Sequence, residues 1–334
     1  MASTIKDVAK LANVSIATVS RILNGQPGYS LKTKKKVLEA IDELGYHPNA
    51  IARGLINKKT HTIGVLFPHL SGSMVIELLR GIEKAASEHE SSVIVCHTES
   101  DPNKTMKYLQ LLAEKRVDGI IYTSEVLQEN QYDFITKMKV PLVLLSTQSE
   151  LPIPYVKVSD FEAAYSATEY LIQKGHQNIG MISGNKEDMI AGKPRIDGFI
   201  QAMKDYNLKV DTDSVMVTSG FSFWDGKMGL VNLLNQKPQT TAIFTASDEM
   251  AVGAISAASQ FGINVPNDLS IIGYDNINLA SMSVPPLTTI HQPFMEMGEI
   301  AGKMLMEMMD TDQVPGSSIV PHKIIERMSV KERS

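Results

Sequence analysis

The sequence has little of what marks secreted, disulfide-bonded or membrane-spanning proteins. Its 334 residues include one cysteine, Cys96, so a disulfide framework and a cysteine-based zinc site are excluded. No apolar run approaches the roughly 18 residues that a membrane-spanning helix needs. Lys6, Asp7 and Lys10 interrupt the N-terminal segment, so a signal-peptide core is not expected. We therefore expect a cytoplasmic protein with no metal ion or other cofactor.

Charge is distributed unevenly along the chain. Residues 1–60 carry ten Lys or Arg and four Asp or Glu, a net charge of +6, whereas the remaining 274 residues carry 22 and 33, a net charge of −11. A small basic segment ahead of a large acidic one indicates that only the first meets a polyanion. Because 43% of the residues are apolar, a chain of this length predicts two or three packed domains.

The first 45 residues predict three short helices. Thr4 and Ser15 are suited to cap helices over 5–12 and 16–23, and a third helix over about 31–44 is expected to end at Gly45. Two short helices joined by a tight turn and braced by a third are typical of a helix-turn-helix DNA-binding domain.

From Thr62 onward, β-branched runs alternate with amphipathic helical segments. The expected strands are 62–67, 92–97, 117–123, 141–145, 155–158, 178–183, 214–217, 241–245 and 269–273. Amphipathic helices are expected to fill the gaps, for example at 75–89, 103–114, 163–174, 196–206 and 250–261, and a methionine-rich helix is expected at 295–309. This alternation predicts buried parallel strands in two similar α/β units, with ligands beyond the carboxyl ends of the strands.

Several short motifs resemble one family along almost the whole chain. The motifs are Asp7-Val8-Ala9, Val14-Ser15, Thr18-Val19-Ser20-Arg21, Asn24, Arg116-Val117-Asp118-Gly119, Asp248-Glu249-Met250-Ala251 and Ile272-Gly273-Tyr274-Asp275. Together they resemble the lactose/galactose repressor (LacI/GalR) family of bacterial transcription regulators, and residues 46–55 resemble its hinge. The resemblance implies an all-α helix-turn-helix head and an α/β two-lobed body, similar to periplasmic sugar-binding proteins, with two parallel-sheet subdomains.

The resemblance also implies domain boundaries. We expect a DNA-binding domain at 1–47, a hinge helix and linker at 48–60, and an effector-binding and dimerisation domain at 61–334. In that last domain, the N-lobe is expected at about 61–160 and 291–322, and the C-lobe at about 161–290 and 323–334.

The start of the second helix is the expected reader of DNA sequence. Arg21 can donate two hydrogen bonds to a guanine, whereas Ile16 and Ala17 would contact thymine methyl groups. In the hinge, Leu55 matches the leucine that family members insert into the minor groove. The DNA-binding candidates are Ile16, Ala17, Thr18, Ser20, Arg21, Asn24, Asn49, Ala52 and Leu55.

The cleft between the lobes is where the resemblance implies that an effector binds. Arg195 matches an anchor for hydroxyls or carboxylates, Asp275 a carboxylate that accepts from sugar hydroxyls, and Phe221 an aromatic platform. Met189 and Ala191 stand where purine-responsive members carry polar contacts, which favours a carbohydrate over a purine. The effector-binding candidates are Met74, Val75, Arg195, Phe221, Trp224, Ser247, Asp248 and Asp275.

These features predict a homodimeric transcription regulator, not an enzyme. It is expected to repress a carbohydrate operon by binding a pseudo-palindromic duplex operator, under allosteric control by a small sugar or sugar derivative. One alternative is a catabolite-control regulator that uses a phosphorylated carrier protein as co-repressor. Another is a sugar-binding protein without a role on DNA, and a third is an enzyme acting on a sugar or nucleotide, although no motif marks a paired general acid and base.

Overall fold

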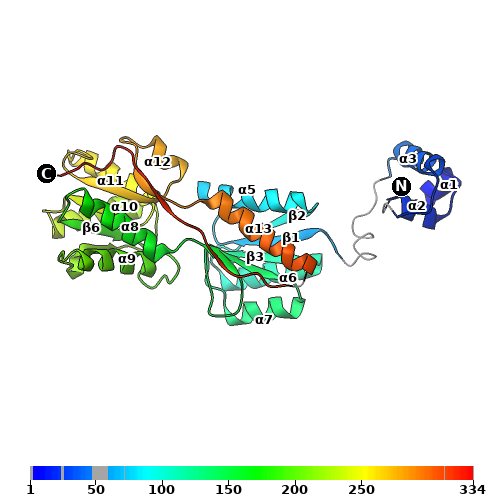
Figure 1. Cartoon of the computed structure of the whole chain (residues 1–334), viewed down its shortest axis with the longest axis horizontal. Helices are drawn as coiled ribbons and strands as arrows, with labels where there is room; N and C mark the ends of the chain where they lie inside the picture. The colour runs from blue at the N-terminus through cyan, green and yellow to red at the C-terminus, as the bar shows by residue number, and fades with distance from the viewer. Residues whose placement is uncertain (1–2, 24–25, 47–58, 71, 312, 334) are drawn as a thin grey trace. The chain divides into compact units, whose positions relative to one another are not determined.

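The computed structural model describes residues 3–23, 26–46, 59–70, 72–311 and 313–333. The chain divides into two compact units, Met1–His61 and Thr62–Ser334, which we call the head and the body and describe separately (Figure 1).

The head contains three helices, α1 (Ile5–Leu11), α2 (Ile16–Leu23) and α3 (Leu31–Leu44). The hydroxyl oxygen of Ser15 accepts a hydrogen bond from the backbone N–H of Thr18 at 3.1 Å, which caps α2, and α3 ends at Gly45 with a φ of 55°. Val8, Val19 and Val37 are fully buried at the centre of the three helices. The prediction of an all-α helix-turn-helix head is therefore confirmed.

The body contains two sheets, each with six strands in the described residues, in the orders β11-β5-β4-β3-β1-β2 and β12-β10-β9-β8-β6-β7. The strands of the first sheet, which belongs to the N-lobe, are β1 (Thr62–Phe67), β2 (Ser92–His97), β3 (Gly119–Thr123), β4 (Leu142–Leu145), β5 (Tyr155–Lys157) and β11 (Ser318–Ile319). The strands of the second sheet, which belongs to the C-lobe, are β6 (Ile179–Ser183), β7 (Val215–Val217), β8 (Ala242–Thr245), β9 (Ser270–Asp275), β10 (Thr288–His291) and β12 (Lys323–Ile325). All pairs are parallel except β10 with β12.

Helices cover both sheets, as parallel strands require. Those of the N-lobe are α5 (Ser73–Glu88), α6 (Pro102–Lys115), α7 (Glu129–Met138) and α13 (Phe294–Thr311). Those of the C-lobe are α8 (Asp160–Gln173), α9 (Gly192–Asp205), α10 (Phe223–Gln236), α11 (Asp248–Gln260) and α12 (Asn278–Met282). The chain passes between the lobes three times, from β5 to α8, from β10 to α13 and from β11 to β12. The predicted two-lobed α/β body with two parallel-dominated sheets is confirmed.

Helices α5 and α13 pack against each other in the N-lobe (Figure 1). Two glycines allow this close approach, because a Cβ on Gly81 would collide with the carbonyl oxygen of Met295 and one on Gly298 with that of Leu78. Met297 and Met306 of the methionine-rich α13 are buried in the core.

The sequence-based expectations differ from the structure toward the C-terminus of the chain, in both sheets. Strands β10, β11 and β12 were not expected, because they have only two to four residues each and little periodicity to detect. Strand β9 also extends to Asp275, two residues beyond the expected end at Gly273.

Candidate functional site

The outward-facing residues of α2 form the candidate DNA interface of the head. Ile16 is 44% exposed, and Ala17 and Arg21 are also exposed. Thr18 and Ser20 are half-buried, and the hydroxyl of Thr18 shares a 2.8 Å hydrogen bond with that of Ser15. The arrangement leaves the guanidinium of Arg21 accessible at the surface for a bidentate contact with a base. The remaining DNA-binding candidates, Asn24, Asn49, Ala52 and Leu55, lie outside the described residues.

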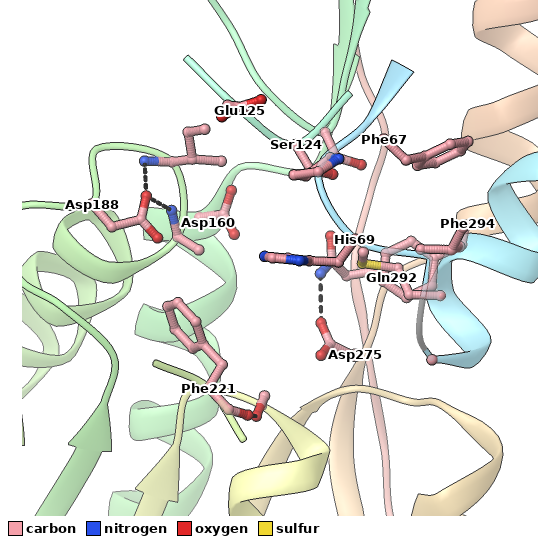
Figure 2. Close-up of a pocket in the computed structure, with 18 of the residues that line it drawn as sticks. Phe67, His69, Ser124, Glu125, Asp160, Asp188, Phe221, Asp275, Gln292 and Phe294 are labelled. Atoms are coloured by element: carbon pink, nitrogen blue, oxygen red, sulfur yellow. Dashed lines mark hydrogen bonds between the residues drawn. The ribbon is translucent and has the colours of Figure 1, made fainter. Parts of the chain in front are cut away.

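A cavity of about 670 Å³ lies between the two sheets of the body. Residues at or just after the carboxyl ends of strands form much of its wall, namely Phe67 (β1), Ser124 (β3), Ser146 (β4), Lys157 (β5), Ser247 (β8) and Asp275 (β9). This is the position that parallel sheets give to ligand sites. Figure 2 shows Phe221 on one side of the cavity and Phe67 and Phe294 on the other.

Arg195, on α9, is 93% buried and is held by a network on the cavity wall. Its Nε and Nη2 donate to Oδ1 of Asp160 at 3.0 and 2.9 Å, and its Nη1 donates to the carbonyl oxygen of Ala246. Its guanidinium carbon lies 3.8 Å from the ring centroid of Tyr274, whose hydroxyl also donates to Asp160 at 3.1 Å. Because a guanidinium has five N–H groups, two are not used by these three hydrogen bonds, and Arg195 lines the cavity.

Asp275 projects from the end of β9 with an unusual backbone. Its φ of 113° is in a region that few non-glycine residues adopt, and such strain is common at binding sites. Nε2 of Gln292 donates to its Oδ1 at 2.8 Å (Figure 2). Burial raises the pKa of Asp275 to about 6, although the nearby charge of Arg195 opposes that rise. The carboxylate is therefore placed to accept hydrogen bonds from a ligand.

Phe221 lies against the C-lobe wall, where Gly184 makes room for its ring. A Cβ at Gly184 would lie 2.5 Å from the ring of Phe221. The guanidinium carbon of Arg195 is 5.9 Å from the ring centroid of Phe221. The backbone oxygen of Phe221 accepts a hydrogen bond from the hydroxyl of Ser247 at 2.8 Å. The ring therefore offers the cavity a fixed apolar face.

Six of the eight effector-binding candidates line the cavity, and two do not. The six are Met74, Val75, Arg195, Phe221, Ser247 and Asp275. Trp224 is instead 67% exposed on α10, where its ring packs edge-on against Phe223. Asp248 is fully buried at the start of α11, and its carboxylate accepts from the hydroxyl of Thr289 and the N–H of Ile277. The structure thus places neither Trp224 nor Asp248 in the cavity wall, because helix packing turns the first outward and the strand-to-helix turn encloses the second.

The sequence interpretation missed several residues of the wall. These are Lys157, Asp160, Gln292, Ser124, Ser146, His69, Glu125, Asp188 and Glu249. Ser124 and Ser146 directly follow predicted strands, so the rule about carboxyl ends could have found them. Their hydroxyl oxygens are buried and have no hydrogen-bond partner among the described residues. Such groups are costly unless a ligand or water satisfies them.

Among the described residues, no group of three or more His, Cys, Asp or Glu side chains is placed to hold a metal ion. No helix in that part of the chain is both long and apolar enough to cross a membrane.

Comparison with known proteins gives matches along nearly the whole chain. Residues 60–328 match the family described as periplasmic binding proteins and sugar binding domain of LacI family, and residues 4–49 match bacterial regulatory proteins, lacI family. Catabolite control protein A of Priestia megaterium is 41% identical over 330 residues, covering 98% of this chain and 99% of the relative.

Two further relatives cover both units. The transcriptional repressor PurR of Pasteurella multocida is 37% identical over 334 residues, covering 99% of each chain. A crystal structure of the Lac repressor dimer bound to operator and the anti-inducer ONPF is 27% identical, with a TM-score of 0.90, and the match covers 99% of this chain and 100% of that one. None of these three relatives is named as an enzyme.

Proposed function

This chain belongs to the lacI family of bacterial regulatory proteins, whose members are DNA-binding transcription regulators, and we propose that it represses a carbohydrate-utilisation operon in response to a sugar or sugar derivative. The observation that carries the proposal is the cavity between the lobes, which offers Arg195, Asp275 and the ring of Phe221. Charged groups that donate and accept hydrogen bonds beside an aromatic face are what a polyhydroxylated ring requires.

We propose a separate role for each of three consecutive segments of the chain. Residues 1–47 bind the operator, residues 48–60 act as the hinge, and residues 61–334 bind the effector and pair two chains. In the head, Ile16, Ala17 and Arg21 read base edges, whereas Thr18 and Ser20 hold phosphates. A homodimer presents two heads to a pseudo-palindromic operator in the cytoplasm.

Control by the effector follows from the three chain crossings between the lobes. A ligand that bridges the lobes favours one angle between them, and this changes the affinity of the paired heads for the operator. A coupling free energy of about 1–3 kcal/mol corresponds to 5–150-fold regulation of operator affinity.

The test uses the full-length protein and fragments of its own genome. We expect selection from a fragment library to enrich a pseudo-palindromic site, and a sugar that raises the melting temperature to change affinity for that site at least about tenfold. The absence of any salt-sensitive preference among fragments would contradict the DNA-binding role. If no sugar changes both the melting temperature of the protein and its affinity for the operator, carbohydrate control is contradicted.

A second candidate is a catabolite-control regulator with a phosphorylated carrier protein as co-repressor. The name of the 41% identical relative, catabolite control protein A, favours it. The same operator assay distinguishes the two candidates, because this one predicts that a phosphorylated carrier protein, and not a sugar alone, increases operator affinity.

A further inference from the structure

The two permanently cationic groups in the cavity wall are already neutralised by the protein. Asp160 accepts from Arg195 through one carboxylate oxygen, and its other oxygen lies 3.4 Å from Nζ of Lys157. The ionised carboxylate of Asp275 supplies a second negative charge near Arg195. Lys157, Arg195, Asp160 and ionised Asp275 thus form a group without net charge.

Three further carboxylates line the same cavity without a cationic partner. They are Glu125 after β3, Asp188 in the loop before α9 and Glu249 in the first turn of α11. None of them lies within 4.0 Å of a Lys, Arg or His nitrogen among the described residues. His69 also lines the cavity, and its charge lowers the pKa of Glu125.

Two of these carboxylates, those of Asp188 and Glu125, accept hydrogen bonds from neutral groups. Oδ1 of Asp188 accepts from the backbone N–H of Ile190 at 2.8 Å and that of Ala191 at 3.3 Å (Figure 2). A carboxylate oxygen of Glu125 accepts from the hydroxyl of Tyr122 at 3.2 Å. Burial raises the pKa of Glu125, whereas its hydrogen bonds with Tyr122 and Thr98 and the charge of His69 oppose the rise.

The neutral part of the wall is suited to hydroxyl groups. Arg195 keeps two free N–H groups, and the hydroxyls of Ser124 and Ser146 have no partner among the described residues. Phe221 supplies an apolar face for a ring. The cavity therefore combines partners for a polyol with an excess of negative charge.

We infer that the effector is an aminated carbohydrate, with a protonated amine facing the carboxylates of Glu125, Asp188 or Glu249 and with ring hydroxyls on Arg195, Ser124 and Ser146. This inference rests on the proposed function and specifies its ligand. A sugar phosphate or sugar acid would bring negative charge into a partly enclosed wall that already carries uncompensated negative charge, where water screens repulsion weakly.

A matched ligand series tests the inference with the full-length protein. Glucose, galactose and mannose are each compared with the 2-amino sugar and the 6-phosphate by thermal shift and calorimetry at pH 7, beside a wider collection of neutral, acidic and aminated sugars and purines. We expect the strongest ligand to be an amino sugar that binds at least about tenfold more tightly than its neutral parent.

The possible outcomes separate this inference from the proposed function. Strongest binding by a neutral sugar, a sugar phosphate or a sugar acid overturns the amine assignment and leaves carbohydrate control intact. Binding by a purine alone, or by nothing in the collection, overturns both.

Variants of the wall give an independent readout. Glu249→Gln and Glu125→Gln should each reduce the affinity ratio of amino sugar to parent about fivefold or more, because each removes one attractive charge. Glu187→Gln is the matched control, since Glu187 is exposed beside Asp188 and does not line the cavity. An unchanged ratio in both wall variants would overturn the inference.

Discussion

Arg195 and Asp160 are joined by two hydrogen bonds, from Nε and Nη2 to a single carboxylate oxygen, although 35 positions separate them in the chain. Both side chains are more than nine-tenths buried. Arg195 therefore has two roles, since it presents donors to the cavity and also neutralises a buried carboxylate at the start of α8.

Replacing Arg195 by Ala should destabilise the body as well as weaken effector binding. We expect Arg195→Ala to lower the free energy of unfolding by about 3 kcal/mol, because Asp160 would keep only Lys157 as a cationic partner. Chemical denaturation of the full chain measures this change. Arg195→Lys is the control, since it keeps the charge and should lose less stability. An unchanged denaturation midpoint for Arg195→Ala would show that the ion pair contributes nothing.

The contact between α5 and α13 should not tolerate a methyl group. We expect Gly81→Ala to lower the free energy of unfolding by about 3 kcal/mol, because its Cβ would meet the backbone oxygen of Met295. Gly316→Ala is the control, since a Cβ there meets open space. Thermal denaturation compares the two, and equal melting temperatures would contradict the packing argument.

Asp275 should make a distinctive contribution to the pH dependence of stability. Burial raises its pKa from 3.8 to about 6, so the folded state binds a proton more tightly than the unfolded state. Its stabilising contribution is therefore present below about pH 4 and is lost as pH rises to about 6. The charge of Arg195 favours the ionised form of Asp275, whereas the charges of Asp160 and Glu249 oppose it. Burial, and then the charge of Asp275, raise the pKa of Asp248.

Asp275→Asn removes this titration. Relative to the wild type, we expect the variant to gain stability by about 1–3 kcal/mol between pH 4 and pH 7. Denaturant unfolding at pH 4, 5, 6 and 7 gives the difference, from which most other titrations cancel. A constant difference across this range would mean that Asp275 has an ordinary pKa.

Arg21 should specify one base in each half-site. We expect Arg21→Ala to weaken operator binding by about 1–3 kcal/mol and to relax the preference at one base pair. Arg21→Lys keeps the charge and loses the planar pair of donors, so it should retain more affinity than specificity. Binding to operators with single base changes measures both effects. A uniform loss across all sequences would assign Arg21 to phosphate contact instead.

Local sequence patterns were sufficient to predict the helices and strands whose formation depends on interactions between residues close in the chain. The helices of the head follow from caps such as Ser15 and from apolar spacing, and α2 has the predicted bounds Ile16–Leu23. Strands β1 and β2 match their predicted bounds because long β-branched runs are distinctive. Short strands such as β11 carry no comparable pattern, and only pairing with β5 defines it.

The candidate site was predicted in part. Arg195, Phe221 and Asp275 were found through the family resemblance and do line the cavity. Trp224 lies three positions after Phe221 and Asp248 directly after Ser247, but Trp224 is exposed on α10 and Asp248 is buried, with its carboxylate bonded to Thr289 of β10. Proximity in sequence could not distinguish these outcomes, because side-chain direction depends on how each element packs.

By itself, the sequence determined the class of the protein, since a basic three-helix segment ahead of an acidic, alternating α/β chain follows from composition, periodicity and motif. Only the tertiary structure decided which charges meet. Asp160 accepts a hydrogen bond from the hydroxyl of Tyr274, 114 positions away in the chain. The carboxylates of the cavity without a cationic partner come from two loops and the first turn of α11, and from both lobes. The reason is that periodicity records which face of an element is buried, whereas the distance between two remote side chains depends on how the strands order and how the lobes join.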